Sequence, residues 1–384
     1  MRMRKVISIV LNNFANDSRV LKENISLQKA GYDVMVIALH DGSSLPEFDT
    51  IQGISVHRIK LKSKRWSKSI LIQILKYIEF LYRVIKQYRN DCDIVHCNDL
   101  NTLPIGVIVK KFYKKNAIIV YDAHELETEI NGLTISQKKT LKILEKKLIK
   151  YANGIITVSD SIANEYVRLY SIDKPTLILN TPSFININKM DIFRNIFNIS
   201  KEQVIFLYQG GLSEGRGIEI LLDAFKIIND SRHPLYGKAV MIFMGMGPLS
   251  DLVQKNTKEH HNIYYLPAVS PEVLLNYSSS ADFGVLFYEN ICLNHNYCSP
   301  NKIFEYIMAE LPVLVSDLYE MKRFVNETKI GCISKDNTPE GLISAIHDIL
   351  GMNKQELISN IRKIKTVYNW EEQEKTLLKL YRKL

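Results

Sequence analysis

Short apolar runs alternate with segments of helical periodicity along most of the chain. In the first half, these patterns predict strands at 5–11, 33–39, 54–59, 93–97, 117–121 and 154–158, with helices at 17–30, 69–89, 101–113, 136–151 and 160–169. Parallel strands joined by crossover helices produce this alternation. The rhythm breaks at about 171–200, in a stretch rich in Pro, Asn and Ile that we interpret as a linker.

The same rhythm restarts after the linker. It predicts strands at 204–210, 240–245, 263–266, 282–287, 313–316 and 329–333, and helices at 217–229, 248–258, 271–277, 300–311 and 338–350. The tail beyond about 355 is helical and charged. The sequence therefore predicts an α/β protein with two Rossmann-like, doubly wound parallel-sheet domains. Ligands are expected at the carboxyl ends of the strands, in a central cleft that the two halves face.

The formal net charge of +9 is concentrated in one segment. Arg58–Arg89 holds ten Lys or Arg residues and one acidic residue, Glu79, so the rest of the chain is close to neutral. The segment contains a helical pattern with a wide apolar face, which suits an anionic membrane surface. The alternative is a helix that buries its apolar face and leaves its lysines in water. No nucleic-acid recognition motif accompanies the charge, so nucleic acid is not an expected partner.

The five cysteines show no pairing pattern. Their odd number and the absence of CxxC favour reduced thiols and a cytoplasmic setting. Cys292, His295 and Cys298 are evenly spaced, but no fourth ligand is evident, so we expect no metal site. No apolar run reaches the roughly 18 residues that span a bilayer. We interpret the basic and then apolar start, MRMRKVISIVL, as a buried strand and not as a signal peptide.

Three turns in the second half are suited to binding an anion. GGLSEGRG (210–217) leads from a strand into a helix and carries Arg216, GMGP (245–248) follows the next strand, and Lys302 lies in the first turn of a helix that Ser299 is expected to cap. Glycines allow close approach of the backbone, and helix starts favour negative charge. A glycine-rich turn can also simply reverse the chain. The three termini together favour a phosphate ligand, although neither a Walker loop nor GxGxxG is present.

Glu305 lies one turn further along the helix that carries Lys302. A carboxylate behind phosphate-binding termini can accept hydrogen bonds from sugar hydroxyls, as an acidic residue holds ribose in dinucleotide-binding folds. The alternative is an exposed helical glutamate without a ligand.

A cluster of polar residues, Tyr121-Asp122-Ala123-His124-Glu125, ends a predicted strand in the first half. A histidine beside two carboxylates can hold a tautomer or move a proton, although a single histidine is often structural. Asp99 follows the strand at 93–97 and lies at a similar strand end. We interpret His96 as a histidine packed within that strand.

These segments resemble retaining glycosyltransferases of the GT-B fold, in glycosyltransferase family four and its Ser-Pro-Asn-Lys subgroup. The similarity runs nearly end to end and is most specific in VYDAHELE (120–127), GGLSEGRGIEILLDAF (210–225), MGMGP (244–248) and SPNKIFEYIMAELPV (299–313). The resemblance implies an acceptor-side domain at 1–180 and a domain at 186–365 that binds the nucleotide sugar. It also implies that a C-terminal helix at about 366–384 packs back on the first domain.

The resemblance implies roles for individual residues. His124 would lie beside the anomeric carbon of the donor sugar, Arg216 and Lys302 would contact the diphosphate in catalysis, and Glu305 would hold the ribose. The further donor-binding positions are Gly210, Gly211, Gly245, Gly247, Ser299 and Asn301. The acceptor-side positions are Asp17, Arg19, Asp99 and Glu125.

Three residues depart from the family pattern. Tyr297 replaces a glutamate that many members place on the donor sugar, and Gly210 replaces an arginine that often assists at the phosphate. Glu310 replaces the glycine that usually follows the helix in a left-handed conformation. We expect Lys302 to compensate for the missing arginine and another contact to hold the sugar.

The resemblance implies that a sugar passes from a nucleotide-diphosphate sugar to a hydroxyl of a lipid-linked or oligosaccharide acceptor. Retention of configuration is expected, with no metal or other cofactor. The product would be a surface polysaccharide such as capsule, lipopolysaccharide or exopolysaccharide, made by a peripheral protein on the inner face of the cytoplasmic membrane. One alternative is an inactive homologue that binds nucleotide sugar or a partner transferase, which Tyr297 motivates. Another is a nucleotide-sugar epimerase of similar two-domain shape.

Overall fold

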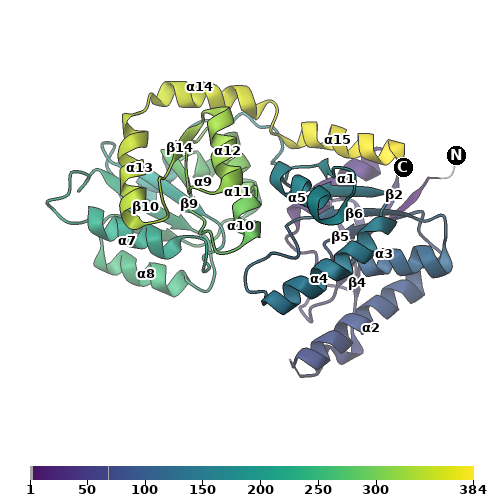
Figure 1. Ribbon diagram of the computed structural model, residues 1–384. Coiled ribbons are helices and arrows are strands. Elements are labelled where there is room, and N and C mark those ends of the chain that lie inside the picture. Colours follow the sequence, from purple (N-terminus) through teal and green to yellow (C-terminus); the bar gives the residue numbers. More distant parts are fainter. Residues whose placement is uncertain (1–2, 68) are drawn as a thin grey trace. The chain divides into compact units, whose positions relative to one another are not determined.

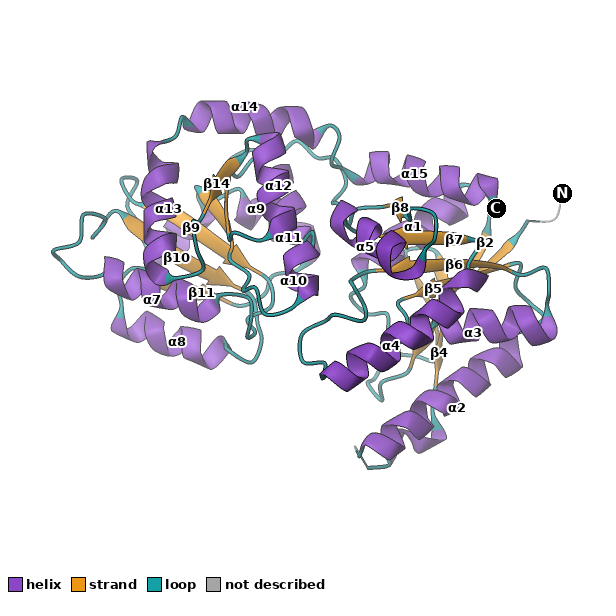
Figure 2. Cartoon of the chain, viewed as in Figure 1, coloured by secondary structure: helices purple, strands orange, loops and turns teal. Residues whose placement is uncertain are grey.

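The computed structural model describes residues 3–67 and 69–384, which form two compact units (Figure 1). One unit runs to Ile178 and takes in Glu374–Leu384, and the other is Leu179–Gln373. Each unit is built on one sheet with helices against it (Figure 2). The predicted α/β architecture with two doubly wound sheets is therefore confirmed.

The first unit contains an eight-stranded sheet with the order β3-β4-β2-β1-β5-β6-β7-β8. Its strands are β1 (Lys5–Ile9), β2 (Asp33–Leu39), β3 (Phe48–Ile51), β4 (Ile54–Ile59), β5 (Ile94–Asn98), β6 (Ile118–Ala123), β7 (Gly154–Thr157) and β8 (Thr176–Leu177). All pairs are parallel except β3 with β4, where Asp49 lies opposite Val56. The chain winds outward in both directions from β1, which pairs with β2 and with β5.

The helices of the first unit follow the predicted crossovers. They are α1 (Ser18–Lys29), α2 (Ile70–Tyr88), α3 (Leu103–Ile108), α4 (Ile135–Leu148) and α5 (Asp160–Tyr170). A π-helical turn, Val109–Tyr113, continues α3, and short 3-10 turns lie at Lys62–Arg65 and Ile149–Tyr151. The C-terminal helix α15 (Trp370–Lys383) lies against this sheet, because a Cβ on Gly154 of β7 would contact Leu380 at 3.3 Å.

The second unit contains a six-stranded sheet with the order β11-β10-β9-β12-β13-β14. Its strands are β9 (Val204–Gln209), β10 (Ala239–Met244), β11 (Ile263–Leu266), β12 (Phe283–Leu286), β13 (Val313–Val315) and β14 (Gly331–Ile333), and every pair is parallel. Its helices are α6 (Ile192–Phe197), α7 (Ile218–Ile228), α8 (Ser250–Glu259), α9 (Pro271–Ser278), α10 (Leu293–Tyr297), α11 (Asn301–Met308), α12 (Tyr319–Thr328), α13 (Pro339–Gly351) and α14 (Lys354–Lys365).

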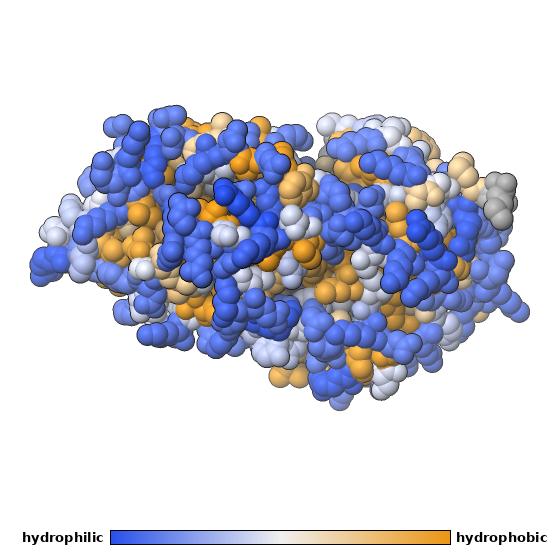
Figure 3. Space-filling model, turned by 90° about the horizontal axis from the view of Figure 1, so that it is seen from above, coloured by the Kyte–Doolittle hydropathy of each residue, from blue (hydrophilic) through white to orange (hydrophobic). Residues whose placement is uncertain are grey.

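The core of the second unit explains why its strands are apolar throughout. All six residues of β10 are buried, because a parallel sheet is covered on both faces. Phe206 of β9 lies between Phe225 of α7 and Phe283 of β12, with ring centroids 6.0 and 5.3 Å away. Burying each such ring contributes about 1.5–3 kcal/mol. Hydrophilic side chains dominate the surface seen in Figure 3, with apolar ones interspersed.

Some local predictions need correction. Helix α11 begins at Asn301 with Pro300 in the cap position, so Ser299 precedes the cap and does not form it. The short elements β3, β8, α6, α10 and α12 are not among the predicted ones. Helix α6 falls within the stretch interpreted as a linker.

Candidate active site

Two glycine turns lie side by side at the carboxyl ends of β9 and β10. Gly210 donates its N–H to Met244 O at 2.8 Å, and Leu212 donates its N–H to Met246 O at 3.0 Å. A Cβ built on Gly245 would lie 1.9 Å from Gly210 O, so no side chain fits there. The turns at 210–217 and 245–248 therefore pack backbone against backbone.

Lys302 and Arg216 lie directly on these turns. Lys302 is only 7% exposed, and its Nζ donates to the hydroxyl of Tyr208 at 2.9 Å. A Cβ on Gly210 would lie 2.5 Å from Lys302 Cε, and one on Gly211 would lie 3.3 Å from Arg216 Nη1. The two glycines thus make room for the two cations, and the structure brings all four residues together.

The two cations affect each other electrostatically. Burial, together with the charge of Arg216, lowers the pKa of Lys302 to about 7, although Glu305 acts in the opposite direction. A bound anion would favour the charged form of the lysine. Helices α7 and α11 both begin in this region, and their N-terminal N–H groups add positive potential. The arrangement is suited to a diphosphate.

Glu305 is held from behind by a glutamine. Gln209, the last residue of β9, donates from Nε2 to Glu305 Oε2 at 2.5 Å, and its Oε1 accepts from Ser278 Oγ at 2.7 Å. Gln209 is fully buried, whereas Glu305 is partly exposed. This fixes the carboxylate at the edge of the anion site. Gln209 is not among the predicted residues, because a single glutamine at a strand end carries no motif.

The remaining donor-side positions border the same turns. Gly247 donates its N–H to Ser250 Oγ at 2.9 Å, and a Cβ on it would lie 2.3 Å from Leu212 O. Asn301 is exposed at the first position of α11, and Ser299 lies two residues before it. Backbone packing thus accounts for Gly247, while Asn301 offers a polar side chain at the surface.

Tyr297 and Glu310, which depart from the family pattern, have clear local environments. Tyr297 ends α10 and packs its ring edge-on against Tyr319, with centroids 5.9 Å apart. Glu310 adopts φ 57°, the left-handed conformation that a glycine usually supplies. Its carboxylate binds Arg362 at 2.7 Å and Lys365 at 3.4 Å, so α14 stabilises the strained residue.

In the first unit, His124 follows β6 and lies between two carboxylates. Its Nε2 is 3.2 Å from Asp122 Oδ2, its Nδ1 is 3.4 Å from Asp99 Oδ1, and its side chain is 20% exposed. Burial opposes a charge on the ring, but Asp99 and Asp122 outweigh it and raise the pKa of His124 to about 9. His124 is therefore an imidazolium at neutral pH.

The acceptor-side positions fall in three different environments. Asp99 adopts φ 64° and donates its N–H to Asp122 O at 2.8 Å, which places its carboxylate beside His124. Glu125 is exposed. Asp17 is the N-cap of α1, where its side chain accepts from the N–H of Val20 at 3.2 Å.

Arg19, the fourth acceptor-side position, lies in the interior of the first unit. It is buried, and its Nη2 donates to Asp122 Oδ1 at 2.8 Å while its Nη1 donates to Ile178 O at 2.8 Å. The acceptor-side role of Arg19 therefore stays a prediction. In the structure its guanidinium supports Asp122, which is buried and contacts His124.

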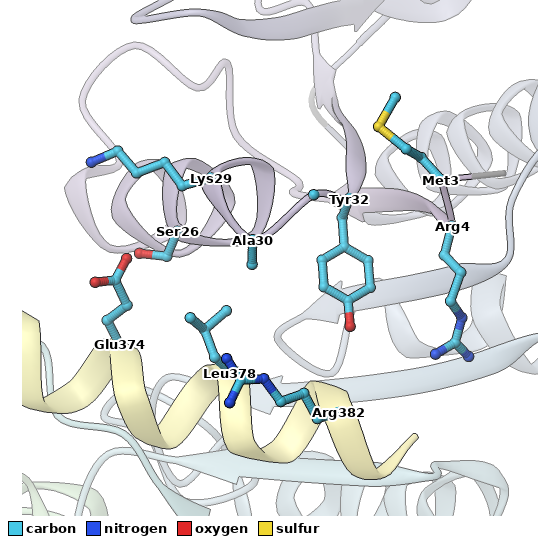
Figure 4. A pocket seen from close by; sticks show the side chains of 10 residues that line it. Met3, Arg4, Ser26, Lys29, Ala30, Tyr32, Glu374, Leu378 and Arg382 are labelled. Carbon is cyan, nitrogen blue, oxygen red and sulfur yellow. The ribbon is translucent and has the colours of Figure 1, made fainter. Parts of the chain in front are cut away.

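A cavity of about 640 Å³ lies elsewhere in the first unit (Figure 4). It is lined by Met3, Arg4, Ser26, Lys29, Ala30, Gly31, Tyr32, Glu374, Leu378 and Arg382. These residues lie just before β1, at the end of α1 and in the turn from α1 to β2, and in α15. The cavity therefore lies at the amino ends of the strands, whereas Asp99 and His124 follow their carboxyl ends. It is not the candidate active site.

The two doubly wound sheets form the GT-B fold, a class that includes many glycosyltransferases, and comparison with known proteins specifies the family. The family model described as "Glycosyltransferase Family 4" matches residues 25–181. The model described as "Glycosyl transferases group 1" matches residues 203–352. The chain belongs to glycosyltransferase family 4. It is thus a member of a retaining family and transfers a sugar from a nucleotide sugar.

Relatives with known names support the same class. An uncharacterized glycosyltransferase of Methanocaldococcus jannaschii is 23% identical over 378 residues, which cover 93% of this chain and 91% of the relative. The chitobiosyldiphosphodolichol beta-mannosyltransferase of Kluyveromyces lactis is 23% identical over 383 residues, which cover 90% of this chain and 83% of the relative.

Solved structures show the same fold. Sucrose-phosphate synthase from Thermosynechococcus elongatus has a TM-score of 0.78 at 16% identity, covering 99% of this chain and 98% of that one. HepE of Anabaena, solved in complex with UDP-glucose, has a TM-score of 0.72 at 12% identity, covering 99% of this chain and 100% of that one. These likenesses confirm the GT-B fold.

Proposed function

We propose that this enzyme transfers the sugar of a nucleotide-diphosphate sugar, with retained anomeric configuration, to a hydroxyl of a lipid-linked glycan acceptor. The donor side of this proposal rests on one observation: Arg216, Lys302 and Glu305 lie together at the paired glycine turns of the second unit. The likeness to HepE, which was solved with UDP-glucose, supports this assignment.

The diphosphate is proposed to lie over the two glycine turns, against Arg216 and Lys302. The bond between the anomeric carbon and the diphosphate oxygen breaks, and negative charge develops on the leaving group. Two preorganised cations and the starts of α7 and α11 stabilise that charge, so the proposal requires no metal ion. Glu305, fixed by Gln209, is proposed to accept hydrogen bonds from the ribose hydroxyls.

His124 is proposed to position the donor sugar. Because its ring is charged at neutral pH, it has no free lone pair with which to accept a proton. The acceptor oxygen is proposed to attack the anomeric carbon on the face from which the diphosphate leaves, which retains the configuration. Because His124 cannot act as the base, a diphosphate oxygen takes the acceptor proton, which balances the step.

We propose a lipid-linked acceptor because the surface of α2 is suited to contact a membrane. The first turns of this helix expose Ile70 by 80%, Leu71 by 75%, Ile74 by 50% and Ile78 by 51%. Among the described residues, no helix is long and apolar enough to cross a bilayer. An exposed apolar stripe on a basic helix fits the surface of an anionic membrane.

Basic residues flank this stripe, with one exception. Lys62, Lys64 and Arg65 are exposed in the 3-10 turn before α2, but Arg58 is buried and binds Asp49 at 2.8 Å. Arg58 therefore does not contribute to the basic surface that the sequence predicts, and Lys68 lies outside the described residues.

We propose that the apolar stripe of α2 docks on the cytoplasmic leaflet, where a lipid-linked intermediate of a surface polysaccharide is elongated. The name of the Kluyveromyces lactis relative, which specifies a dolichol diphosphate acceptor, supports a lipid-linked acceptor here.

A transfer assay tests the proposal. Labelled UDP- and GDP-sugars are incubated with the protein and lipid extract of its native host, and label in the lipid fraction is measured for wild type, Glu305→Gln and the exposed control Glu340→Gln. We expect transfer by wild type and by the control, and at least a hundredfold loss in Glu305→Gln. Donor binding without turnover would support an inactive homologue, and donor conversion without acceptor would support an epimerase; either result contradicts the proposal.

A further inference from the structure

A buried polar cluster lies directly behind His124. It consists of Arg19 and Glu23 from α1, His96 from β5, Asp122 from β6 and Tyr381 from α15. Each side chain is at most 4% exposed, so none of the five can touch a substrate. Asp122 contacts His124, which makes it the member through which the others can act on the ring.

Arg19 fixes the Asp122 carboxylate. Its Nη2 donates to Asp122 Oδ1 at 2.8 Å and to Oδ2 at 3.0 Å, while its Nε donates to Oδ2 at 3.2 Å. Burial alone would raise the pKa of Asp122, but Arg19 and His124 hold it well below its usual value. Asp122 is therefore ionised, with one oxygen shared between Arg19 and His124.

Glu23, unlike Asp122, accepts no hydrogen bond from Arg19. Its Oε1 lies 3.2 Å from Arg19 Nε and its Oε2 lies 3.6 Å from His96 Nε2, yet neither oxygen accepts a hydrogen bond from any described residue. Its nearest oxygen is within 4.8 Å of Asp122. One guanidinium faces two carboxyl groups, and a buried carboxylate without hydrogen bonds is costly.

Shared protonation resolves this conflict. Two carboxyl groups close together cannot both ionise at low cost, so one of them keeps its proton. Burial is the largest cause that raises the pKa of Glu23 to about 8, and the charge of Asp122 is the second. Arg19 and His124 act in the opposite direction. A neutral Glu23 can donate its proton to Asp122, which no ionised Glu23 can do.

We propose that Glu23 is a positioning residue for the transfer reaction: its neutral carboxyl donates to Asp122 and fixes the carboxylate that orients His124. His96 supports this arrangement from the other side. Its Nδ1 lies 2.6 Å from the hydroxyl of Tyr381, and its Nε2 faces Asp122 at 3.7 Å. The catalytic importance of the orientation rests on the role proposed above for His124, but the proton on Glu23 does not.

A metal ion is the competing occupant of this cluster. Glu23, His96 and Asp122 could offer three ligand atoms close together. Arg19, however, places a permanent positive charge against two of the three, at 2.8 Å from Asp122 and 3.2 Å from Glu23. A divalent cation would have to displace or repel that guanidinium, so the geometry favours a shared proton over a metal ion.

The test follows the titration of His124 itself. The charged groups that act on its ring are Arg19, Glu23, Asp99 and Asp122. Behind them lie His96 at Asp122, Tyr381 at His96 and Glu127 near Asp99. Protein with isotope-labelled histidine is titrated by NMR as wild type, Glu23→Gln and Glu23→Met. The His124 signal is assigned with His124→Gln, and exposed His261 of the second unit serves as the internal control.

A neutral Glu23 predicts a distinct pattern. Glu23→Gln keeps a donor toward Asp122, so turnover at pH 7 falls by less than about threefold. Glu23→Met removes the donor, which leaves more of the Asp122 charge for His124. The pKa of His124 is then about one higher in Glu23→Met than in Glu23→Gln, and kcat falls at least tenfold while KM for the donor changes little.

Three results would overturn the proposal. A Glu23 carboxyl that titrates below about pH 6, followed by NMR of isotope-labelled glutamate and assigned by its loss in Glu23→Gln, would show that Glu23 is ionised at neutral pH, and this decides the question even if Glu23→Met does not fold. Equal pKa values of His124 in Glu23→Met and Glu23→Gln would show that a donor at position 23 does not act on His124. Stoichiometric metal in the purified protein, lost in Glu23→Gln, would favour the metal site. Because titration does not depend on turnover, failure of the proposed function is distinguishable from each of these.

Discussion

Lys302 illustrates how burial makes the charge of one side chain depend on its ligand. Its ammonium lies over the ring of Tyr208, with Nζ 4.1 Å from the centroid, and has little contact with water. Burial, with the help of Arg216, brings its pKa to about 7. A diphosphate would supply the negative charge that restores the ammonium, so ligand binding and proton uptake are linked.

We predict that donor binding takes up a proton above neutral pH. At pH 8 a lysine of pKa 7 is about 90% neutral, so binding takes up close to one proton, and affinity falls up to about tenfold for each further pH unit. Titration calorimetry of UDP or GDP in buffers of different ionisation enthalpy measures the uptake. Lys302→Met should bind more weakly, with heats independent of buffer. Equal heats for wild type in all buffers would refute the linkage.

The glycine turns give a second test at single positions. In Gly245→Ala, the new Cβ would collide with Gly210 O, which lies 1.9 Å from the ideal position, so the two turns must separate. We expect donor affinity to fall at least tenfold, about 1.4 kcal/mol. Gly351→Ala is the matched control, because its Cβ meets nothing within 4 Å. Equal donor affinity in the two variants would show that close packing of the turns is not required.

At the scale of elements, β6, α4 and α5 are joined by one buried carboxylate. Glu145 of α4 accepts hydrogen bonds from the hydroxyls of Tyr121 at 2.5 Å, Tyr166 at 2.7 Å and Tyr170 at 2.5 Å. Hydrogen bonds to a charged group contribute about 1.5–3 kcal/mol each. The three tyrosines thus tie both helices to the strand that carries Asp122 and ends just before His124.

We predict a graded loss of stability when this junction is weakened. Tyr170→Phe should lower the free energy of unfolding by about 1.5–3 kcal/mol, since one charge-assisted hydrogen bond is lost. Glu145→Ala should cost more, because it removes the carboxylate that accepts from three hydroxyls. Calorimetric melting measures both, and exposed Tyr82→Phe is the control. Melting of Tyr170→Phe at the wild-type temperature would contradict the assignment.

The N-terminal half of α2 is the element proposed to contact lipid. Only Phe80, Val84 and Ile85 of this helix are buried, and all three lie in its second half. The first half of the helix is held by polar contacts: Tyr77 donates its hydroxyl to Asn101 O at 2.7 Å, and Lys76 donates to Trp66 O at 3.1 Å. This leaves the apolar stripe available for docking.

We expect vesicle binding to depend on both the apolar stripe and its basic flank. Leu71→Ser combined with Ile74→Ser should reduce binding to anionic vesicles at all salt concentrations. Replacing Lys62, Lys64 and Arg65 with Gln should reduce it by about 1 kcal/mol per charge at low salt and less at high salt. The control replaces exposed Lys255, Lys258 and Lys335 of the second unit. Unchanged partitioning of the first two variants would leave α2 as an ordinary solvated helix.

How much the sequence predicts depends on how locally each feature is encoded. The long apolar runs of buried parallel strands and the glycine turns are local, and the predicted strands β1, β2, β9 and β10 are all present. The edge strand β3, FDTI, has exposed and polar positions and therefore lacks that signal. The same limit applies to the site, because Arg19 and Asp122 lie 103 residues apart and Gln209 lies 96 residues from Glu305. Only the fold brings such pairs together.

At the scale of the whole molecule, the two units divide the work. Each sheet changes winding direction at a central strand, β1 in the first unit and β9 in the second, and ligands bind such sheets at the carboxyl ends beside that point. The second unit gathers the proposed diphosphate and ribose contacts there. The first unit gathers His124 and the buried groups behind it, including Tyr381 from the C-terminal helix.

A crystal structure of the protein with a nucleotide-diphosphate sugar tests this account most directly. We predict that the diphosphate oxygens lie within hydrogen-bonding distance of Arg216 and Lys302, above the turns at 210–217 and 245–248, with ribose hydroxyls on Glu305. A nucleotide bound elsewhere, or a diphosphate that contacts neither cation, would contradict it.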